Sequence, residues 1–211
     1  MSRPAEPTVY LVDDDAGVRD ALGFLLGTVG LPVRAFADGR AFQEQLDPGA
    51  VGCLLLDIRM PHVSGLQLQE QLRVAGVDLP VVILTGHGNV DLCRRAFRQG
   101  AVDFLEKPVD ETTLLEAVQR AIHLHLSRRE QRGAGEQARA RLARLTDRER
   151  EVLAGLMDGQ TSKQSARVLG ISARTVETHR ASLCEKLGVR SLAELMRTYL
   201  SAVDSAGPGS P

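Results

Sequence analysis

The sequence has little cysteine, few aromatic residues and no long hydrophobic run. Its 211 residues include three cysteines and no Trp, and aromatic residues make up only 3%. The cysteines are scattered without a C-x-x-C pair, which indicates neither a disulfide framework nor a zinc site. We therefore expect three buried thiols in a reducing cytosol, at Cys53, Cys93 and Cys184.

Hydrophobic runs long enough for a membrane span, about 18 residues, do not occur. The first seven residues, MSRPAEP, lack the apolar segment of a signal peptide. The sequence therefore predicts a cytoplasmic protein without a membrane segment. Hydrophobic residues at 43% and charged residues at 25% are close to the globular average, so a packed core is expected.

The net charge of −1 conceals a difference between the two halves of the chain. Residues 1–126 contain 11 Lys and Arg against 17 Asp and Glu, whereas residues 127–211 contain 15 against 10. An acidic first half and a basic second half indicate two domains with different partners, the second of which fits nucleic acid.

The first half alternates short apolar runs with segments of helical periodicity. Two runs, 53–56 and 81–84, are continuously apolar, which is typical of strands buried on both faces of a parallel sheet. The pattern predicts an α/β domain over residues 1–126, a doubly wound (βα)5 parallel sheet. Its expected strands are Thr8–Val12, Val33–Ala37, Cys53–Leu56, Val81–Leu84 and Asp103–Leu105.

The second half predicts a small all-α domain of four helices over residues 144–200. A polar, partly helical linker over 127–143 precedes it, with Gly133 and Gly135 as weak points. Thr146 and Glu149 form the spacing of a capping box, so a helix begins there. Further helices are expected at Ser162–Leu169, Ser172–Leu187 and Ser191–Tyr199, and the Gly/Ser/Pro tail 201–211 is expected to be disordered.

Polar residues follow four of the predicted strands. Asp13 and Asp14 come after the first strand, Asp57 after the third, Thr85 after the fourth and Lys107 after the fifth. A single Asp here is often only a helix cap, but all five meet at the carboxyl edge of a parallel sheet, where such folds bind ligands. Crowded carboxylates favour a cation, and oxygen ligands of this kind suit Mg2+. Lys107 and Thr85 complete a group able to hold a phosphoryl.

The motifs VDDD at 12–15, LDIRMP at 56–61, TGHG at 85–88 and FLEKP at 104–108 resemble the receiver domain of two-component response regulators over residues 8–125. The resemblance implies that Asp57 accepts a phosphoryl group from a phosphohistidine of a sensor kinase. It implies that Asp14, Asp57 and the carbonyl of Arg59 ligate Mg2+, with Asp13 acting mainly through water. It also implies that Thr85 and Lys107 contact the phosphoryl oxygens, and that Lys107–Pro108 is a cis peptide.

The resemblance further implies a switch in which Thr85 moves toward the phosphate and Phe104 rotates inward. From the residues alone, a simple core aromatic is the favoured interpretation of Phe104. Charges of opposite sign on neighbouring elements could pair across a two-fold dimer or form an ordinary solvated face. They are Arg94, Arg95 and Arg98 on one side and Asp103, Glu106, Glu111 and Glu116 on the other. We expect Arg59 and His87 to affect phosphoryl loss, and expect His62, His123 and His125 at the surface.

The helices at 162–169 and 172–187 are joined by the short turn of a helix-turn-helix. On the second helix Val176, Leu183 and Leu187 form the inward stripe, so the opposite face is free to enter a DNA major groove. Expected phosphate contacts are Lys163, Arg174, Arg180 and Lys186. Expected base contacts are Glu177, Thr178 and Ala181. With only Tyr199 available for base stacking in this half, duplex DNA is preferred over RNA or single strands.

The segments LTDREREVL at 145–153, TVETHR at 175–180 and KL at 186–187 resemble the LuxR-type helix-turn-helix of FixJ/NarL response regulators over residues 144–200. The chain departs from that family at Ser165, which replaces an apolar packing residue. The resemblance implies a transcription regulator, an activator more often than a repressor. It implies a homodimer when phosphorylated, and a sensor histidine kinase, double-stranded promoter DNA and RNA polymerase as partners.

Two other hypotheses remain open on the sequence. One is a Mg2+-dependent phosphotransferase with Asp57 as nucleophile, although the chain has no second acid two residues after Asp57. The other is a DNA-binding protein whose first domain only dimerises or binds a ligand, which the intact acidic set disfavours. We favour the regulator, which is not an enzyme acting on an outside substrate.

Overall fold

The computed structural model describes residues 6–86 and 90–204. The chain divides into two compact units, Met1–Arg128 and Arg129–Pro211, and each is described by itself. His87, Gly88 and Asn89 lie outside the described residues, and with them the expectation for His87.

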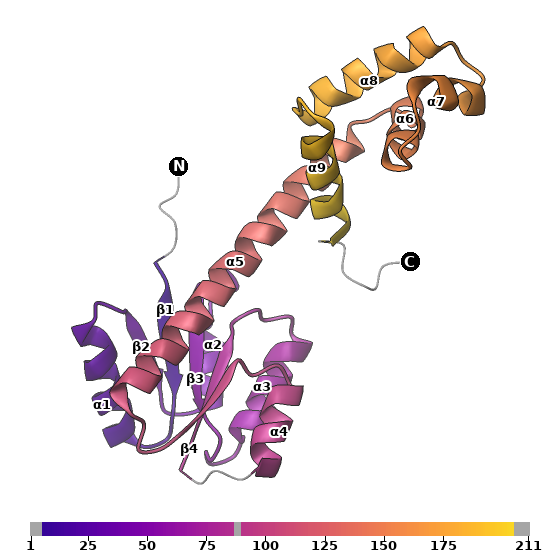
Figure 1. The fold of residues 1–211 in the computed structure, drawn as a ribbon. Helices are drawn as coiled ribbons and strands as arrows, with labels where there is room; N and C mark the ends of the chain where they lie inside the picture. Colours follow the sequence, from indigo (N-terminus) through magenta and orange to yellow (C-terminus); the bar gives the residue numbers. More distant parts are fainter. Residues whose placement is uncertain (1–5, 87–89, 205–211) are drawn as a thin grey trace. The chain divides into compact units, whose positions relative to one another are not determined.

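The first unit is built on a five-stranded parallel sheet of order β2-β1-β3-β4-β5 (Figure 1). The order reverses after β1, as in a doubly wound sheet, so the predicted fold is confirmed. β3 and β4 are buried along their whole length, as their uninterrupted apolar sequences predict. The strands are β1 (Thr8–Val12), β2 (Val33–Phe36), β3 (Gly52–Asp57), β4 (Val81–Thr85) and β5 (Asp103–Glu106).

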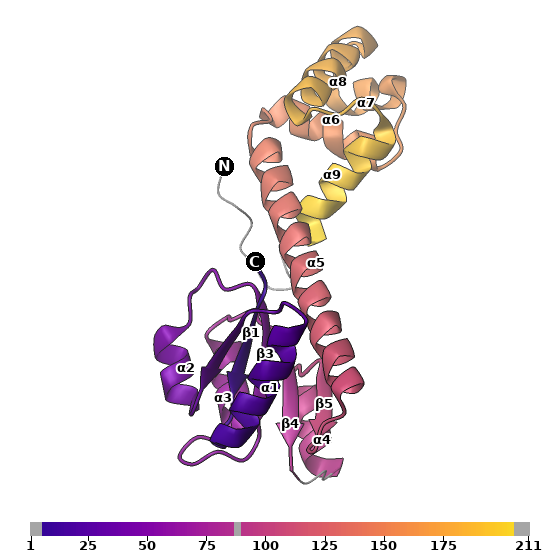
Figure 2. The ribbon, with the colours of Figure 1, turned by 90° about the vertical axis from the view of Figure 1, so that its left-hand side faces the viewer.

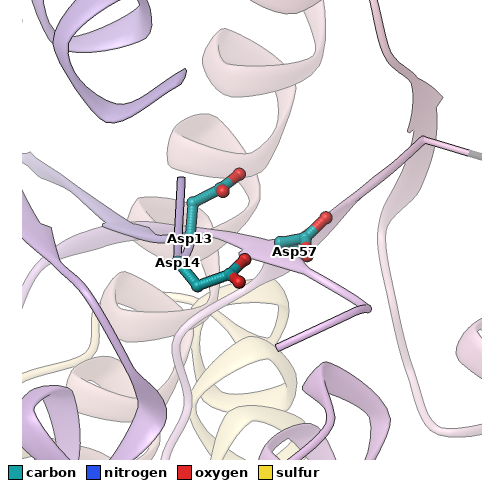
Figure 3. A group of neighbouring side chains, drawn as sticks. All are labelled: Asp13, Asp14 and Asp57. Carbon is teal, nitrogen blue, oxygen red and sulfur yellow. The ribbon is translucent and has the colours of Figure 1, made fainter. Parts of the chain in front are cut away.

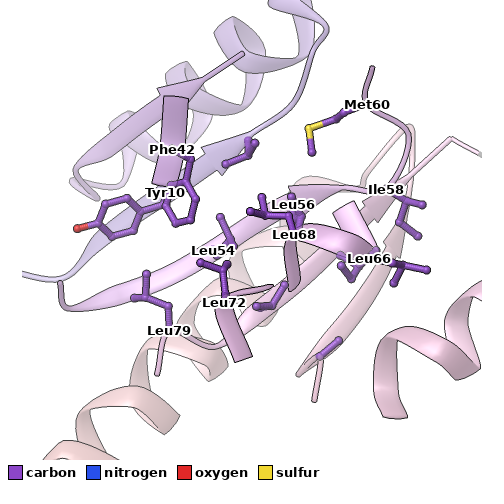
Figure 4. Packing of buried hydrophobic residues seen from close by; sticks show 14 of the residues in the cluster. Tyr10, Phe42, Leu54, Leu56, Ile58, Met60, Leu66, Leu68, Leu72 and Leu79 are labelled. Atoms are coloured by element: carbon purple, nitrogen blue, oxygen red, sulfur yellow. The ribbon is translucent and has the colours of Figure 1, made fainter. Parts of the chain in front are cut away.

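Helices cover both faces of the sheet, each over its own apolar cluster. On one face α2, α3 and α4 enclose a cluster that includes Tyr10, Phe42, Leu56 and Leu68 (Figure 4). On the other face α1 and α5 pack over Leu11, Leu55 and Leu84 (Figure 2). The bounds are α1 (Ala16–Thr28), α2 (Gly39–Gln45), α3 (Gly65–Val74), α4 (Val90–Arg98) and α5 (Glu111–Ala143).

The second unit follows the predicted helices closely. Thr146 caps α6 (Asp147–Met157) through the expected reciprocal hydrogen bonds with Glu149. α7 (Ser162–Leu169) and α8 (Ala173–Leu187) form the helix-turn-helix, with Gly170 in the left-handed conformation at the turn. Val176, Leu183 and Leu187 are buried, which confirms the inward stripe of α8. Ser165 is also buried, where its hydroxyl donates to Gln160 Oε1 at 3.2 Å.

Four local expectations need correction. The predicted linker is helical throughout and forms the end of α5, since Gly133 costs too little to interrupt a helix whose flanking residues favour it. The last helix, α9 (Leu192–Asp204), extends beyond Tyr199, so residues 201–204 are not a tail. Cys53 is buried, but Cys93 and Cys184 are only half-buried, and all three are free thiols.

His125 is the fourth correction, because it lies in the core rather than at the surface. Its side chain is 1% exposed, and its Nδ1 lies 3.1 Å from the nitrogen and 2.9 Å from the oxygen of Gly52. The contact joins α5 to the beginning of β3. His62 and His123 are exposed, as expected.

Candidate phosphoacceptor site and nucleic-acid interface

The carboxyl ends of the parallel strands bring the predicted acidic residues together. β3 lies between β1 and β4, so Asp57 at the end of β3 lies beside Asp13 and Asp14 after β1 (Figure 3). One oxygen of each carboxylate lies within 4.8 Å of the others. Backbone contacts fix this edge: the amide of Lys107 donates to the Thr85 carbonyl at 2.7 Å, and Arg19 Nη1 donates to the Asp13 carbonyl at 2.7 Å.

Lys107 is the cation of this site. Its Nζ lies 2.5 Å from Asp13 Oδ2 and 3.0 Å from Asp57 Oδ1, so one ammonium serves two carboxylates. Asp13 is fully buried and Asp57 is 4% exposed, whereas Asp14 is exposed. Asp14 adds a third negative charge beside this ammonium, so a further cation would offset the excess negative charge of the site.

The pKa values reflect this imbalance. Burial raises the pKa of Asp57, against the lowering effect of its hydrogen bond and ion pair with Lys107, and the nearby Asp13 raises it as well. Burial acts to lower the pKa of Lys107, but its hydrogen bonds to Asp13 and Asp57 raise it on balance, so its ammonium stays charged. Asp57 is thus a buried carboxylate whose charge is incompletely compensated.

The donor set fits Mg2+. Carboxylate oxygens are hard ligands, and the uncompensated charge of Asp13, Asp14 and Asp57 is what a small divalent cation neutralises.

The remaining predicted residues of this edge also occupy distinct positions. Thr85 is fully buried at the end of β4, and Phe104 on β5 is half-buried against the α2–α4 face of the sheet. The backbone amide of Arg59 donates to Asp57 Oδ2 at 2.9 Å. The Lys107–Pro108 peptide is cis, which confirms that expectation.

One close approach at this site escaped the sequence reading. A Cβ on Gly65, the first residue of α3, would lie 2.1 Å from the carbonyl oxygen of Asp57. Only glycine fits there, so α3 begins against the backbone of the acidic residue. The LDIRMP motif lies close by in the chain, but a lone glycine gives no signal that it touches Asp57.

The outer face of α8 presents the predicted DNA contacts. Arg174, Glu177, Thr178 and Ala181 are exposed, as is Lys163 on α7. Glu177 and the half-buried Arg180 of α8 are already engaged: Ser162 of α7 donates a short hydrogen bond to Glu177 Oε1 and accepts one from Arg180 Nη1 at 2.8 Å. The recognition face is therefore partly preorganised from the neighbouring helix.

Lys186 occupies a different environment from the other predicted phosphate contacts. Its Nζ lies 2.7 Å from Glu149 Oε2, and Glu149 also accepts from Ser182 Oγ at 2.7 Å and from the Thr146 amide at 2.8 Å. These hydrogen bonds, that of Lys186 foremost, lower the pKa of Glu149 to about 2. The sequence predicted Glu149 only as part of a capping box and gave no sign of this buried ion pair.

A doubly wound domain with this acidic edge, joined to a helix-turn-helix domain, defines a signal-receiving transcription regulator. Family models agree over both halves: residues 9–119 match the response regulator receiver domain, and residues 143–199 match bacterial regulatory proteins of the luxR family. The chain belongs to the two-component response regulators of this receiver and LuxR-type architecture.

Individual relatives span nearly the whole chain. It is 39% identical to the transcriptional regulatory protein FixJ of Bradyrhizobium diazoefficiens over 92% of this chain and 95% of the relative. It is 40% identical to the transcriptional regulatory protein TdiR of Thauera aromatica over 90% of this chain and 83% of that relative. The solved structure of the response regulator StyR has a TM-score of 0.81 and 41% identity, and covers 93% of this chain and 99% of that one. Among the described residues, no helix has the length and hydropathy to cross a membrane.

Proposed function

We propose that this regulator is switched by phosphorylation of Asp57 by a sensor histidine kinase. The observation that carries the proposal is the buried Asp57 carboxylate, which lies 3.0 Å from Lys107 beside two further aspartates. A phosphoryl group adds about −1.5 to −2 charge, so its acceptor needs cations close by.

The residues divide the chemistry between them. An Asp57 oxygen attacks the phosphorus of the phosphohistidine, the P–N bond breaks, and the imidazole leaves. Lys107 stays beside the new phosphoryl and offsets its charge, while the buried Thr85 hydroxyl donates to a phosphoryl oxygen. Asp14, Asp57 and the Arg59 carbonyl would hold Mg2+, with Asp13 acting through water, and the bound ion would neutralise the oxygens of the transferring group.

We propose that phosphorylation is transmitted as homodimerisation through α4, β5 and α5. Thr85 moves toward the phosphoryl and Phe104 turns into the space it leaves. Arg94, Arg95 and Arg98 are exposed on α4, and the acids Glu106, Glu111 and Glu116 are exposed on β5 and α5, so the two sets can pair across a two-fold axis. Asp103 takes a smaller part, because it already pairs with Arg120 at 2.6 Å.

The output is binding of double-stranded promoter DNA by α8. Lys163, Arg174 and Arg180 are the proposed phosphate contacts, and Glu177, Thr178 and Ala181 the proposed base contacts. Lys186, the fourth expected phosphate contact, is held by Glu149 in the free protein. Two copies would read two half-sites and recruit RNA polymerase, with activation as the outcome. The regulator acts in the cytoplasm. Steady turnover of an external phosphoester would contradict the regulator hypothesis and favour an enzyme.

The test is light scattering after size-exclusion chromatography of the full chain. Wild type and Asp57→Asn are compared with Mg2+ alone and with Mg2+ plus acetyl phosphate, and phosphoryl uptake is followed by intact mass. We expect wild type to gain one phosphoryl group and shift from monomer to dimer, and the variant to do neither. Uptake without a shift would refute the dimer mechanism, and absence of uptake would refute Asp57 as the acceptor.

A further inference from the structure

The predicted DNA-reading face contains a three-residue cluster that spans two helices. Ser162 is the first residue of the scaffold helix α7, while Glu177 and Arg180 lie on the recognition helix α8. The Ser162 hydroxyl donates to Glu177 Oε1 and accepts from Arg180 Nη1 at 2.8 Å, and Arg180 Nη1 lies 3.8 Å from Glu177 Oε1. One hydroxyl therefore links the exposed Glu177 to the half-buried Arg180.

The cluster uses only one oxygen of the Glu177 carboxylate. Both contacts go to Oε1, and within the described residues Oε2 forms no hydrogen bond. A carboxylate can accept about four hydrogen bonds, so Oε2 keeps its full capacity. Glu177 is exposed, which leaves this second oxygen accessible to a base edge.

A carboxylate that approaches DNA is repelled by the phosphates unless its charge is compensated. Arg180 provides part of that compensation, and Ser162 fixes both side chains, which are otherwise long and freely rotating. Holding a contact group in its bound conformation reduces the entropy lost on binding. The hydrogen-bond donor that a carboxylate recognises in the major groove is the cytosine amine.

We infer that Ser162 is a positioning residue for sequence recognition: it orients Glu177 so that Oε2 accepts a hydrogen bond from cytosine at one base pair of each half-site. The role rests on the proposed function of α8 as the recognition helix. Arg180 then also offsets the charge of Glu177. Because its guanidinium donates to Ser162, it is less available as a phosphate contact.

The chain offers clean variants for a test. Thr161, not Ser162, is the N-cap of α7, so Ser162→Ala removes the hydroxyl without removing the cap. Ser162→Thr keeps a hydroxyl at the same carbon. Ser201→Ala is the matched control, because the Ser201 hydroxyl donates to the Arg197 carbonyl of its own helix, its one hydrogen bond within the described residues.

The experiment is selection from a pool of randomised duplexes by the full chain, with Mg2+ and acetyl phosphate and without them, followed by sequencing. We expect wild type to prefer cytosine at one position by about tenfold, a size typical of one good side-chain–base contact. Ser162→Ala and Glu177→Gln should flatten that position alone, at least about threefold, whereas Ser162→Thr restores it and Ser201→Ala leaves it unchanged.

Two results would overturn the role of Ser162 while leaving DNA binding intact. One is a Ser162→Ala profile identical to that of wild type. The other is a uniform loss of affinity for all sequences, which marks a phosphate contact or a folding defect. If wild type selects no duplex under either condition, the proposed function of α8 fails together with the inference.

Discussion

Asp57 in the receiver unit and Glu149 in the DNA-binding unit are both almost fully buried carboxylates, yet their surroundings shift their pKa values in opposite directions. Glu149, 3% exposed, accepts from Lys186, Ser182 and the Thr146 amide. Asp57, 4% exposed, shares with Asp13 the one cation that contacts it among the described residues. The charge of Glu149 is compensated by its neighbours in the fold, whereas that of Asp57 is compensated only in part. Burial alone therefore does not set the direction of the pKa shift, which depends on the partners of each carboxylate.

Removing the charge of Glu149 should have the largest effect on stability. Glu149→Gln leaves Lys186 without its partner and weakens three hydrogen bonds, so we expect the unfolding free energy of the DNA-binding unit to fall by about 2–4 kcal/mol. Hydrogen exchange followed peptide by peptide measures both units in one sample. Glu151→Gln is the matched control: its ion pair with Arg148 is exposed, and its loss should cost about 0.5 kcal/mol.

The same variant tests the sign of the pKa shift. The pKa of Glu149 lies at about 2 in the fold against an ordinary 4.5, so its ionisation stabilises the unit above about pH 4.5. That contribution is lost as the pH falls from 4.5 toward 2. The difference between wild type and Glu149→Gln should therefore be constant near neutrality and shrink below pH 4.5. A difference that grows in acid would contradict the assignment.

Asp57→Asn should have the opposite effect in the other unit. Replacing Asp57 removes a buried charge that competes with Asp13 for Lys107, so we expect the receiver unit to gain about 1–2 kcal/mol in unfolding free energy without Mg2+. Chemical denaturation at neutral pH measures the gain, with exposed Asp20→Asn as the control. Adding Mg2+ should stabilise wild type and not the variant. Destabilisation by Asp57→Asn would mean that the carboxylate is structural after all.

The sequence predicts those parts of the molecule whose signals are local. Buried strands show as apolar runs, the Thr146 capping box as a four-residue motif, and the acidic edge follows from strand ends in a parallel sheet. What it missed depends on contacts between distant residues. His125 bonds with Gly52, 73 positions away, and Lys186 with Glu149, 37 positions away. A charged or imidazole side chain looks the same in sequence whether its partner is water or a buried group.

The end of α5 shows a second limit of prediction from sequence, which concerns glycines inside a helix. Gly133 and Gly135 in a polar segment suggest a weak linker, but each glycine costs a helix only about 1 kcal/mol, and the Ala, Arg, Glu and Gln around them favour it. Local propensity summed over the segment outweighs two unfavourable residues. Gly170 and Gly188 differ from these two glycines: they lie at the ends of α7 and α8 in the left-handed conformation, where glycine ends a helix.

The salt dependence of DNA affinity should distinguish Lys163 from Lys186, although the sequence predicts both as phosphate contacts. Lys163 is exposed and has no ion pair within the described residues, so Lys163→Ala should reduce the slope of log affinity against log salt by about 0.9. Lys186 is held by Glu149 at 2.7 Å, and its removal should leave the slope nearly unchanged. Glu149→Gln/Lys186→Met removes both partners, so the loss is not confused with an unpaired buried acid. Fluorescence anisotropy on a labelled duplex gives the slopes. Equal reductions for both lysines would show that Lys186 leaves Glu149 for a phosphate when DNA binds, and the distinction between structural and functional charge would then hold only for the free protein.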